Sequence, residues 1–215
     1  MDIILDTIEV RVLGSLLEKD LATPEYYPLS LNALINACNQ KTNRLPILAL
    51  DEGTVVNALQ SLKKKRLVGQ SDTSRVPKYW HDFIKQNNLI RLEAALLCLL
   101  LLRGPQTAGE LRGRTERLCA FENPEEVLRY LDNLAEIGFV RKLPRQPGQK
   151  EQRFAHLLSG EPENTEQFSN QLEPTTAITD TENDHIAELI KSVALLKEEI
   201  EILKNEFLSF KKEFE

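Results

Sequence analysis

The chain has 215 residues, of which 41% are hydrophobic and 28% are charged, the balance of an ordinary globular protein. Its longest apolar run covers residues 94–102, whereas a membrane-spanning helix needs about 20 residues, and the first residues lack the basic and apolar parts of a signal peptide. Three widely separated cysteines and three scattered histidines argue against a disulfide framework and a zinc site. We therefore expect a cytoplasmic protein without membrane contact, metal or cofactor.

The net charge of −6 is distributed unevenly along the chain. Residues 1–88 carry a net charge of +1, residues 89–160 a net charge of +2, and residues 161–215 a net charge of −9. The acidity therefore belongs to the last quarter of the chain. A nucleic-acid partner for the slightly basic body is not excluded.

The first part of the chain predicts three helices and a β-hairpin. Helical spacing of apolar residues predicts a first helix over roughly residues 6–20. Ser30 is the expected N-cap of a short second helix, and Asp51 that of a third. The extended stretches 68–72 and 76–80 follow and are joined by a polar turn.

The same order of elements recurs in the next part of the chain. A helix over roughly residues 89–102 is followed by a second one with Thr107 as N-cap. Asn-Pro-Glu-Glu at residues 123–126 predicts the start of a third helix, and Gly138 predicts its end. Two extended stretches complete the copy, residues 139–143 and 152–157.

These two series are copies of one unit, because apolar positions of the third helices recur 72 residues further on. The corresponding residues are Val55, Val56, Leu59 and Leu62 in the first copy and Val127, Leu128, Leu131 and Leu134 in the second. Three helices followed by a β-hairpin is the order of a winged helix. We expect a mainly α fold of the α+β winged-helix kind, with domains over residues 1–88 and 89–159. Two unrelated small helical units are the alternative.

The end of the chain predicts a linker and a coiled coil. Residues 160–183 are polar with few apolar side chains and are expected to form a disordered linker. Residues 184–215 repeat apolar residues at the a and d positions of four heptads. These residues are Ile186, Leu189, Val193, Leu196, Ile200, Leu203, Phe207, Phe210 and Phe214. Self-association is expected, and a lone helix that folds back onto the body is the alternative.

The heptads also predict an orientation. β-Branched residues at a and leucine at d favour a parallel two-stranded coiled coil. In that arrangement, glutamates at g face lysines at e of the partner helix, whereas the antiparallel arrangement brings like charges together. The residues concerned are Glu199, Glu206, Lys204 and Lys211. We expect a parallel homodimer, with a higher oligomer as the alternative.

The sequence contains no motif of a known catalytic site, such as GxSxG, HExxH or a phosphate-binding loop. Cys38 lies on the apolar face of its helix and is expected to be a small buried hydrophobe. His81 has no identifiable partner and is expected to be a surface or packing histidine. We therefore expect that the protein is not an enzyme and has no catalytic residues.

The third helix of the first copy carries the strongest signal for DNA binding. Small polar side chains on its outer face suit base edges, and the basic run at its end suits phosphate groups. The candidate residues are Thr54, Asn57, Ser61, Lys63, Lys64, Lys65 and Arg66. A solvated helix end is the alternative for the basic run, because cations also suit the C-terminal end of a helix.

Two further segments add candidate DNA contacts. The third helix of the second copy is acidic, so it is not expected to enter a groove, but the hairpin after it is basic. Its candidates are Arg141, Lys142, Arg145, Lys150 and Arg153. The polar loop after the second helix contributes Lys41, Asn43 and Arg44, which suit phosphate or a protein partner and alternatively only solvate the loop.

The loop belongs to a longer recognisable stretch. Tyr-Pro-Leu-Ser-Leu-Asn-Ala-Leu at residues 27–34 continues into Cys-Asn-Gln-Lys-Thr-Asn-Arg at residues 38–44 and Pro46. Together with Arg-Val-Leu-Gly-Ser-Leu-Leu-Glu-Lys at residues 11–19, this stretch resembles the YceH-like family of uncharacterised bacterial proteins, over roughly residues 5–158. The resemblance implies a tandem winged-helix fold, from which DNA binding is inferred. It implies no catalytic or ligand residues.

Two hypotheses for the function follow. The first is a dimeric protein that binds double-stranded DNA, such as a transcriptional regulator, with two half-sites joined by the coiled coil. The second is a scaffold that binds a protein partner, because a fold alone does not give a function, and the acidic second copy and tail favour it. DNA binding gains if the basic cluster and the second hairpin share one surface, and the scaffold gains if they point apart.

Overall fold

A computed structural model describes residues 4–71, 75–145 and 151–161. The described residues lie within one compact unit. The predicted coiled coil, with its nine heptad residues, and the predicted linker beyond residue 161 lie outside them. Across the three described ranges, no helix is both long and apolar enough to cross a membrane.

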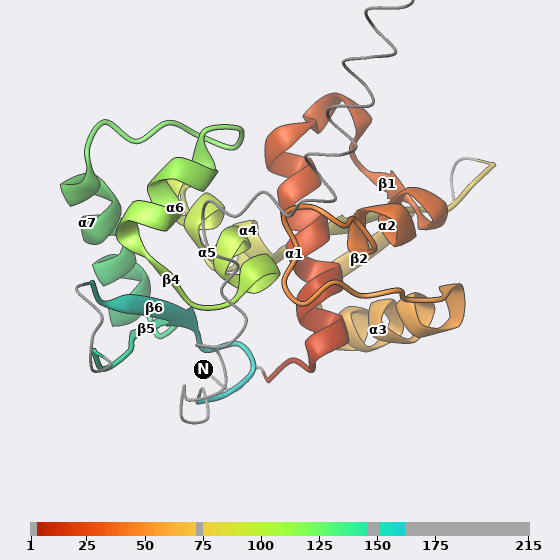
Figure 1. Ribbon diagram of the computed structural model, residues 1–215. Coiled ribbons are helices and arrows are strands. Elements are labelled where there is room, and N and C mark those ends of the chain that lie inside the picture. The colour runs from red at the N-terminus through yellow and green to blue at the C-terminus, as the bar shows by residue number, and fades with distance from the viewer. Residues whose placement is uncertain (1–3, 72–74, 146–150, 162–215) are drawn as a thin grey trace, which may run out of the picture. The chain divides into compact units, whose positions relative to one another are not determined.

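The first half of this α+β unit is built from helices around a small sheet (Figure 1). The helices are α1 (Thr7–Ala22), α2 (Leu31–Cys38) and α3 (Glu52–Lys64), with a 3-10 turn at Pro24–Tyr26. The strands are β1 (Leu29–Ser30), β2 (Val68–Ser71) and β3 (Lys78–His81). They form an antiparallel sheet in the order β1-β3-β2, in which Leu29 and Gln70 both pair with Tyr79.

The second half repeats this order of elements. A short helix, α4 (Phe83–Gln86), connects the two halves. The helices α5 (Arg91–Arg103), α6 (Ala108–Thr115) and α7 (Pro124–Glu136) follow, with the strands β4 (Gln106–Thr107), β5 (Val140–Lys142) and β6 (Arg153–His156). This sheet is also antiparallel, in the order β4-β6-β5. The internal repeat predicted from the sequence is therefore present in the described part of the chain.

Side-chain caps determine where the helices begin, as the sequence predicts. The side chain of Ser30 accepts a hydrogen bond from the third backbone amide of α2, and Asp51 and Thr107 do the same for α3 and α6. Asn123 caps α7 in the same way, 2.8 Å from the amide of Glu126. Gly138 follows the end of α7 with φ of 82°, a conformation that costs glycine little.

Four short elements are not predicted from the sequence, namely β1, β4, α4 and the 3-10 turn at Pro24–Tyr26. β1 and β4 have two residues each, too few for an alternating pattern, and both directly precede a helix whose N-cap is their last residue. They exist because β3 and β6 each have a free edge for pairing. The helix α4 is a single turn, closed by Gln86 N donating to Asp82 O.

Helix α1 contacts the helices of both halves, since it packs on α2 and α3 and also on α5 (Figure 1). The packing is tight at Gly14, where an added Cβ would lie 2.9 Å from Leu102 Cδ2 and 3.2 Å from Leu101 Cβ. The Cys98 thiol donates to the Gly14 carbonyl at 3.5 Å. A single hydrophobic cluster therefore runs through both halves.

We expect Gly14→Val to lower the free energy of unfolding by about 1–3 kcal/mol, because the new side chain overlaps Leu101 and Leu102. Chemical denaturation measures this change. Gly113→Val is the matched control, since Gly113 is also helical and a Cβ there has no neighbour within 4 Å. The control should stay within about 0.5 kcal/mol of the wild type. Equal destabilisation by both variants would contradict the close packing of α1 on α5.

Candidate nucleic-acid interface

Helix α3 presents one face to the core and the other to solvent. Its inner face is apolar and buried and consists of Val55, Ala58, Leu59 and Leu62. Because a helix turns once every 3.6 residues, the residues between them point outward. Asn57, Gln60 and Lys64 are exposed and share this outer face at helical spacing. The outer face therefore offers two amide side chains and one ammonium group.

The basic run at the end of α3 divides into free and structural residues. Lys64 and Arg66 are exposed, and neither has a carboxylate partner among the described residues. Lys63 is also exposed, and its ammonium group donates to the neutral side chain of Gln70 at 2.8 Å. Arg66 has φ of 60°, where the chain reverses after the helix.

Lys65 turns inward from the same run. Its Nζ lies 2.7 Å from both carboxylate oxygens of Glu9 and 2.8 Å from the carbonyl oxygen of Ile4. Glu9 is 2% exposed. Burial acts to raise the pKa of Glu9, but hydrogen bonds from Lys65 and Ser61 outweigh it, so the pKa is lowered. Lys65 and Ser61 thus fix α3 to α1, and we do not include them in the interface.

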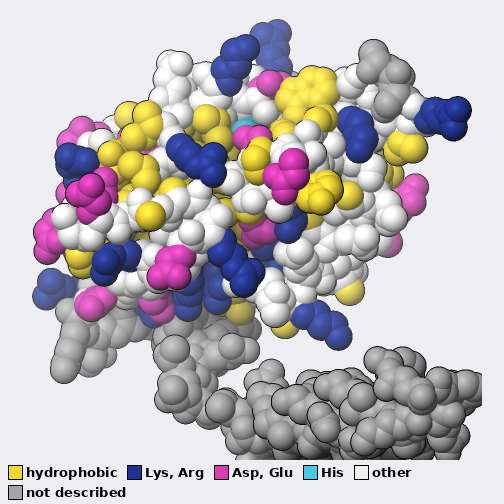
Figure 2. Space-filling model, turned by 90° about the horizontal axis from the view of Figure 1, so that it is seen from above, with side chains coloured by type: hydrophobic (Ala, Val, Ile, Leu, Met, Phe, Trp, Pro, Cys, Tyr) yellow, Lys and Arg dark blue, Asp and Glu magenta, His cyan; other side chains and the backbone are white. Residues whose placement is uncertain are grey.

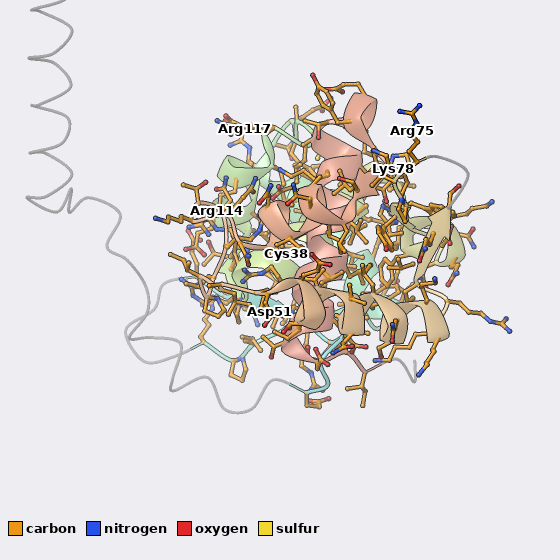
Figure 3. All side chains as sticks on the ribbon, turned by 90° about the vertical axis from the view of Figure 1, so that its right-hand side faces the viewer. Cys38, Asp51, Arg75, Lys78, Arg114 and Arg117 are labelled. Carbon is orange, nitrogen blue, oxygen red and sulfur yellow. The ribbon has the colours of Figure 1, made fainter. Side chains whose placement is uncertain are left out.

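The hairpin β2–β3 adds two cations that the sequence analysis missed. Arg75 is exposed before β3, and Lys78 is half-buried at its start. Neither forms an ion pair with a described carboxylate, and Figure 3 shows both on the same part of the molecule, well away from Arg114 and Arg117. The signal in the sequence was two cations between the turn and the start of β3. The four consecutive cations at residues 63–66 are the stronger basic signal in this part of the sequence.

The hairpin is fixed by its glycine and its tryptophan. Gly69 in β2 pairs with Trp80 in β3, and a Cβ at Gly69 would overlap the indole ring. The indole Nε1 donates to Asp82 at 3.2 Å. Only glycine allows the ring to lie across the neighbouring strand in this way.

The loop between α2 and α3 is held by two buried arginines. Arg44 is 4% exposed; it donates to the carbonyl of Ala37 and to both carboxylate oxygens of Glu18, the closest contact being 2.6 Å. Arg11 donates to the carbonyls of Cys38 and Pro46. Arg44 is therefore not accessible to a ligand, although the sequence analysis named it as a candidate.

Two other residues of this loop remain at the surface. Lys41 is exposed, whereas the side chain of Asn43 accepts a hydrogen bond from Arg103 at 2.8 Å. Asn43 has φ of 61°, a conformation that asparagine tolerates better than most residues. Leu45 and Ile47 are apolar and exposed by 39% and 61%. The loop thus combines a rigid anchor with an exposed apolar tip.

The basic residues of the second hairpin are paired within the protein. Arg141 forms an ion pair with Glu161, Lys142 with Asp132 at 2.6 Å, and Arg153 with Glu110 at 3.2 Å. Arg145 is exposed, and Lys150 lies outside the described residues. The second hairpin therefore offers less free positive charge than its sequence indicates.

Thr54, another candidate from the sequence, lies in the first turn of α3, where its backbone amide donates a hydrogen bond to the side chain of Asp51.

The second hairpin and the basic end of α3 are linked by the chain's first residues. The Leu5 amide donates to the Leu158 carbonyl, just beyond β6, at 2.7 Å. The preceding residue, Ile4, accepts the hydrogen bond from Lys65. Figure 1 shows the hairpin β5–β6 and the start of α1 on the same lower side of the drawing.

Charges of both signs share the surface elsewhere. Figure 2 shows Lys and Arg side chains interspersed with Asp and Glu over the face drawn there. The exposed residues of α7 include Glu125, Arg129 and Glu136, so this helix carries a mixed but acidic face. The interface is therefore defined by unpaired cations on particular elements rather than by one large basic area.

Cys38 is buried, as predicted, and burial raises the pKa of its thiol. His81 is mostly buried, and its Nε2 lies 3.2 Å from Asp20. Within residues 4–71, 75–145 and 151–161, no three His, Cys, Asp or Glu side chains are grouped so as to hold a metal ion. That the protein is not an enzyme stays a prediction.

Comparison with known proteins places the chain in a family. A family described as "Protein of unknown function, DUF480" matches residues 5–149. The chain belongs to the DUF480 family. The YceH-like resemblance predicted from the sequence refers to this same family, so that prediction is confirmed.

Three relatives of this DUF480 chain are similar to it over at least nine tenths of their length. A UPF0502 protein of Solibacter usitatus is 52% identical over 208 residues, which cover 96% of this chain and 100% of the relative. A UPF0502 protein of Geobacter sulfurreducens is 50% identical and covers 91% of each chain. One of Pelobacter propionicus is 46% identical over the full length of both chains. The similarity thus extends into the acidic C-terminal part.

Arg44→Met in this DUF480 chain should lower the free energy of unfolding by about 3 kcal/mol, because the carboxylate of Glu18 loses both hydrogen bonds from the buried Arg44 and keeps only Lys19 as an ion-pair partner. Lys41→Met, in the same loop but exposed, should change it by less than about 0.5 kcal/mol. Urea denaturation of both variants measures the difference. Similar effects at the two positions would contradict a structural role for Arg44.

The effect of Arg44→Met should also depend on pH. Burial acts to raise the pKa of Glu18, but hydrogen bonds and charge from Arg44, with smaller contributions from Lys19, outweigh it, so the folded-state pKa lies below the ordinary value of 4.5. A lowered carboxyl pKa stabilises the folded state above the unfolded-state value and loses this contribution as the pH falls through the folded-state value. The difference between wild type and variant should therefore shrink below pH 4.5.

Proposed function

We propose that each half of the body is a winged helix and that the first binds double-stranded DNA through α3 and the hairpin β2–β3. Helix α3 occupies the place of the recognition helix, since it follows two helices and precedes the hairpin. The hairpin occupies the place of the wing. The order of strands, with a two-residue strand between the first two helices, is the same in both halves.

One observation carries this proposal. In the first half, Lys63, Lys64, Arg66, Arg75 and Lys78 lie at the end of α3 and on the hairpin, and no described carboxylate neutralises any of them. On the hairpin of the second half, Arg141, Lys142 and Arg153 have carboxylate partners, and only Arg145 is exposed without one among the described residues. Since unpaired cations are what a polyanion attracts, the two hairpins are not equivalent, and we assign DNA binding to the first half.

The outer face of α3 indicates which part of the helix contacts DNA. Asn57 and Gln60 carry amides of the kind that contact adenine edges, while Lys64 follows one turn later on the same face. Asp51 and Glu52 at the start of α3 repel phosphate. We therefore assign the middle and the C-terminal end of α3, rather than its first turn, to the contact with DNA.

The predicted coiled coil of residues 184–215 makes this interaction bivalent. Two chains joined in parallel present two first halves to one duplex, and the second contact then benefits from a high effective concentration. Two weak contacts with the same duplex thereby give a higher overall affinity than either contact alone. The linker sets how far apart the two contacts lie on the DNA.

A scaffold function has its own supporting observation. Leu45 and Ile47 are exposed on a loop that Arg11 and Arg44 hold from inside. Exposed apolar side chains on a fixed loop suit a protein partner. If DNA binding fails the test below, this loop is the first candidate for a protein contact.

Fluorescence anisotropy with a labelled mixed-sequence duplex, titrated at several salt concentrations, tests the DNA proposal. The wild type should bind with an affinity that falls steeply with salt, and Lys64→Gln/Arg75→Gln should reduce the slope of log affinity against log salt by about 2. Lys65 is left unchanged, because it supports α1. Its substitution would confuse folding with binding.

Arg112→Gln/Arg117→Gln is the matched control, with the same change of charge on exposed residues in and after α6. This variant should keep the wild-type slope. Absence of binding at low salt by the folded wild type would reject the proposal. An equal loss of slope in both double variants would reject the assignment to the first half.

Disrupting the heptads should separate dimerisation from folding. Leu196→Glu/Leu203→Glu places charges at two d positions, so the mass measured by light scattering should fall from that of a dimer to the 24.5 kDa of one chain. The DNA affinity should fall with it. Ala194→Glu/Asn205→Glu places the same charges at outward heptad positions and should leave a dimer. A dimer in both cases would contradict the predicted coiled coil.

A further inference from the structure

A cavity of about 360 Å³ lies between α6, the loop that follows it and the start of α7. Figure 1 shows this loop as the arch that connects α6 with α7. Sites for small ligands have volumes of about 300–1,000 Å³, and this cavity is at the lower end of that range. Its size therefore suits a small organic molecule.

Much of the cavity is lined by glycines and by apolar rings. Gly109 and Gly113 lie four residues apart on α6, so they share one face of the helix and leave its backbone uncovered. Phe121 of the loop and Pro124 at the start of α7 also line the cavity. Phe121 is 8% exposed and packs against Tyr130, with 6.2 Å between the ring centroids. This apolar lining is therefore held in place by the core of the second half.

Residue 113 is glycine although packing does not require it. A Cβ at Gly113 would have no neighbour within 4 Å, whereas a Cβ at Gly14 would overlap a leucine. Gly113 is not among the glycines with positive φ, so its backbone conformation does not require glycine either. Glycine inside a helix destabilises it relative to alanine. What Gly113 provides in return is open space in the cavity.

Two opposite charges line the same cavity. Arg112 and Glu116 are exposed and lie one helical turn apart on α6. These two described side chains form no ion pair with each other, whereas Arg114 and Glu110 of the same helix do, at 4.0 Å. Arg112 makes a long contact of 3.5 Å with the carbonyl of Glu122, at the limit of a hydrogen bond. Both charged groups therefore keep most of their hydrogen-bonding capacity for a ligand.

We propose that this cavity binds a small zwitterion, namely an α-amino acid with an apolar side chain. A guanidinium group only donates hydrogen bonds and a carboxylate only accepts them. Arg112 therefore binds the carboxylate of the ligand, and Glu116 binds its ammonium group. The apolar side chain of the ligand lies over Gly113 and against Phe121. The site belongs to the second half and does not depend on DNA binding by the first.

Isothermal titration calorimetry of the full-length chain with L-phenylalanine and with L-leucine tests the binding. At least one of them should give saturable heat. The matching acids without an ammonium group (hydrocinnamate, isocaproate) and amines without a carboxylate (phenethylamine, isoamylamine) should bind about ten-fold more weakly or worse, because each loses one charged hydrogen bond. Absence of saturable heat with both amino acids, or an acid or amine that binds as well as its amino acid, would overturn the proposal.

Variants of α6 test where the amino acid binds. Gly113→Leu fills the cavity and should abolish binding, while the protein stays folded because a Cβ at this residue meets no neighbour. Arg112→Gln/Glu116→Gln keeps the net charge and should weaken binding about ten-fold or more. Arg117→Gln/Glu125→Gln is the matched control, since it removes an exposed pair of charges that does not line the cavity. Wild-type affinity in Gly113→Leu, or an equal loss in the control, would reject this site.

Discussion

The contact between α1 and α5 is the constraint on which the rest of the body depends. At Gly14 the two helices approach so closely that the side chains of Leu101 and Leu102 fill the space where a Cβ would stand. Each helix is then covered on two sides, by its own half and by the other. This double cover explains why residues 94–102 are buried without interruption. A leucine side chain contributes about 1.5–3 kcal/mol when fully buried, so separation of the halves would expose a large apolar surface.

Helix α1 also determines the places of the surface elements through buried charges. Glu9 receives Lys65 from the end of α3, while Glu18 receives Arg44 from the loop before it. Both carboxylates would be costly to bury without a partner. The same contacts remove two cations from the surface and leave their neighbours exposed. The division between structural and free basic residues is thus a result of how α1 is placed.

The sequence predicts the helices and hairpins well because their signals are local. Caps such as Ser30 and Asn123 act within one turn, and the repeat doubles the information on each element. The strands β1 and β4 are not predictable in this way, since a two-residue strand exists only through its partner. Their presence follows from tertiary pairing.

The candidate interface is less predictable for a related reason. Lys64 and Lys65 are adjacent and chemically identical, yet one is exposed and the other bonds a carboxylate from a different helix. The sequence predicts a free cation at Arg141, but in the structure Arg141 forms an ion pair with Glu161, which lies 20 residues later in the chain. Sequence patterns give the sum of charge in a segment. Which charges remain free depends on partners that are distant in the chain.

The single tryptophan of the chain has a consequence for how the protein can be studied. Trp80 lies across Gly69 in the hairpin β2–β3, and its indole nitrogen is bonded to Asp82. Lys78, on the same strand, is two residues away. The tryptophan fluorescence of this protein therefore comes from one known position, on the hairpin that carries Arg75 and Lys78. The molecule thus contains its own optical reporter on the hairpin to which we assign the proposed DNA contact.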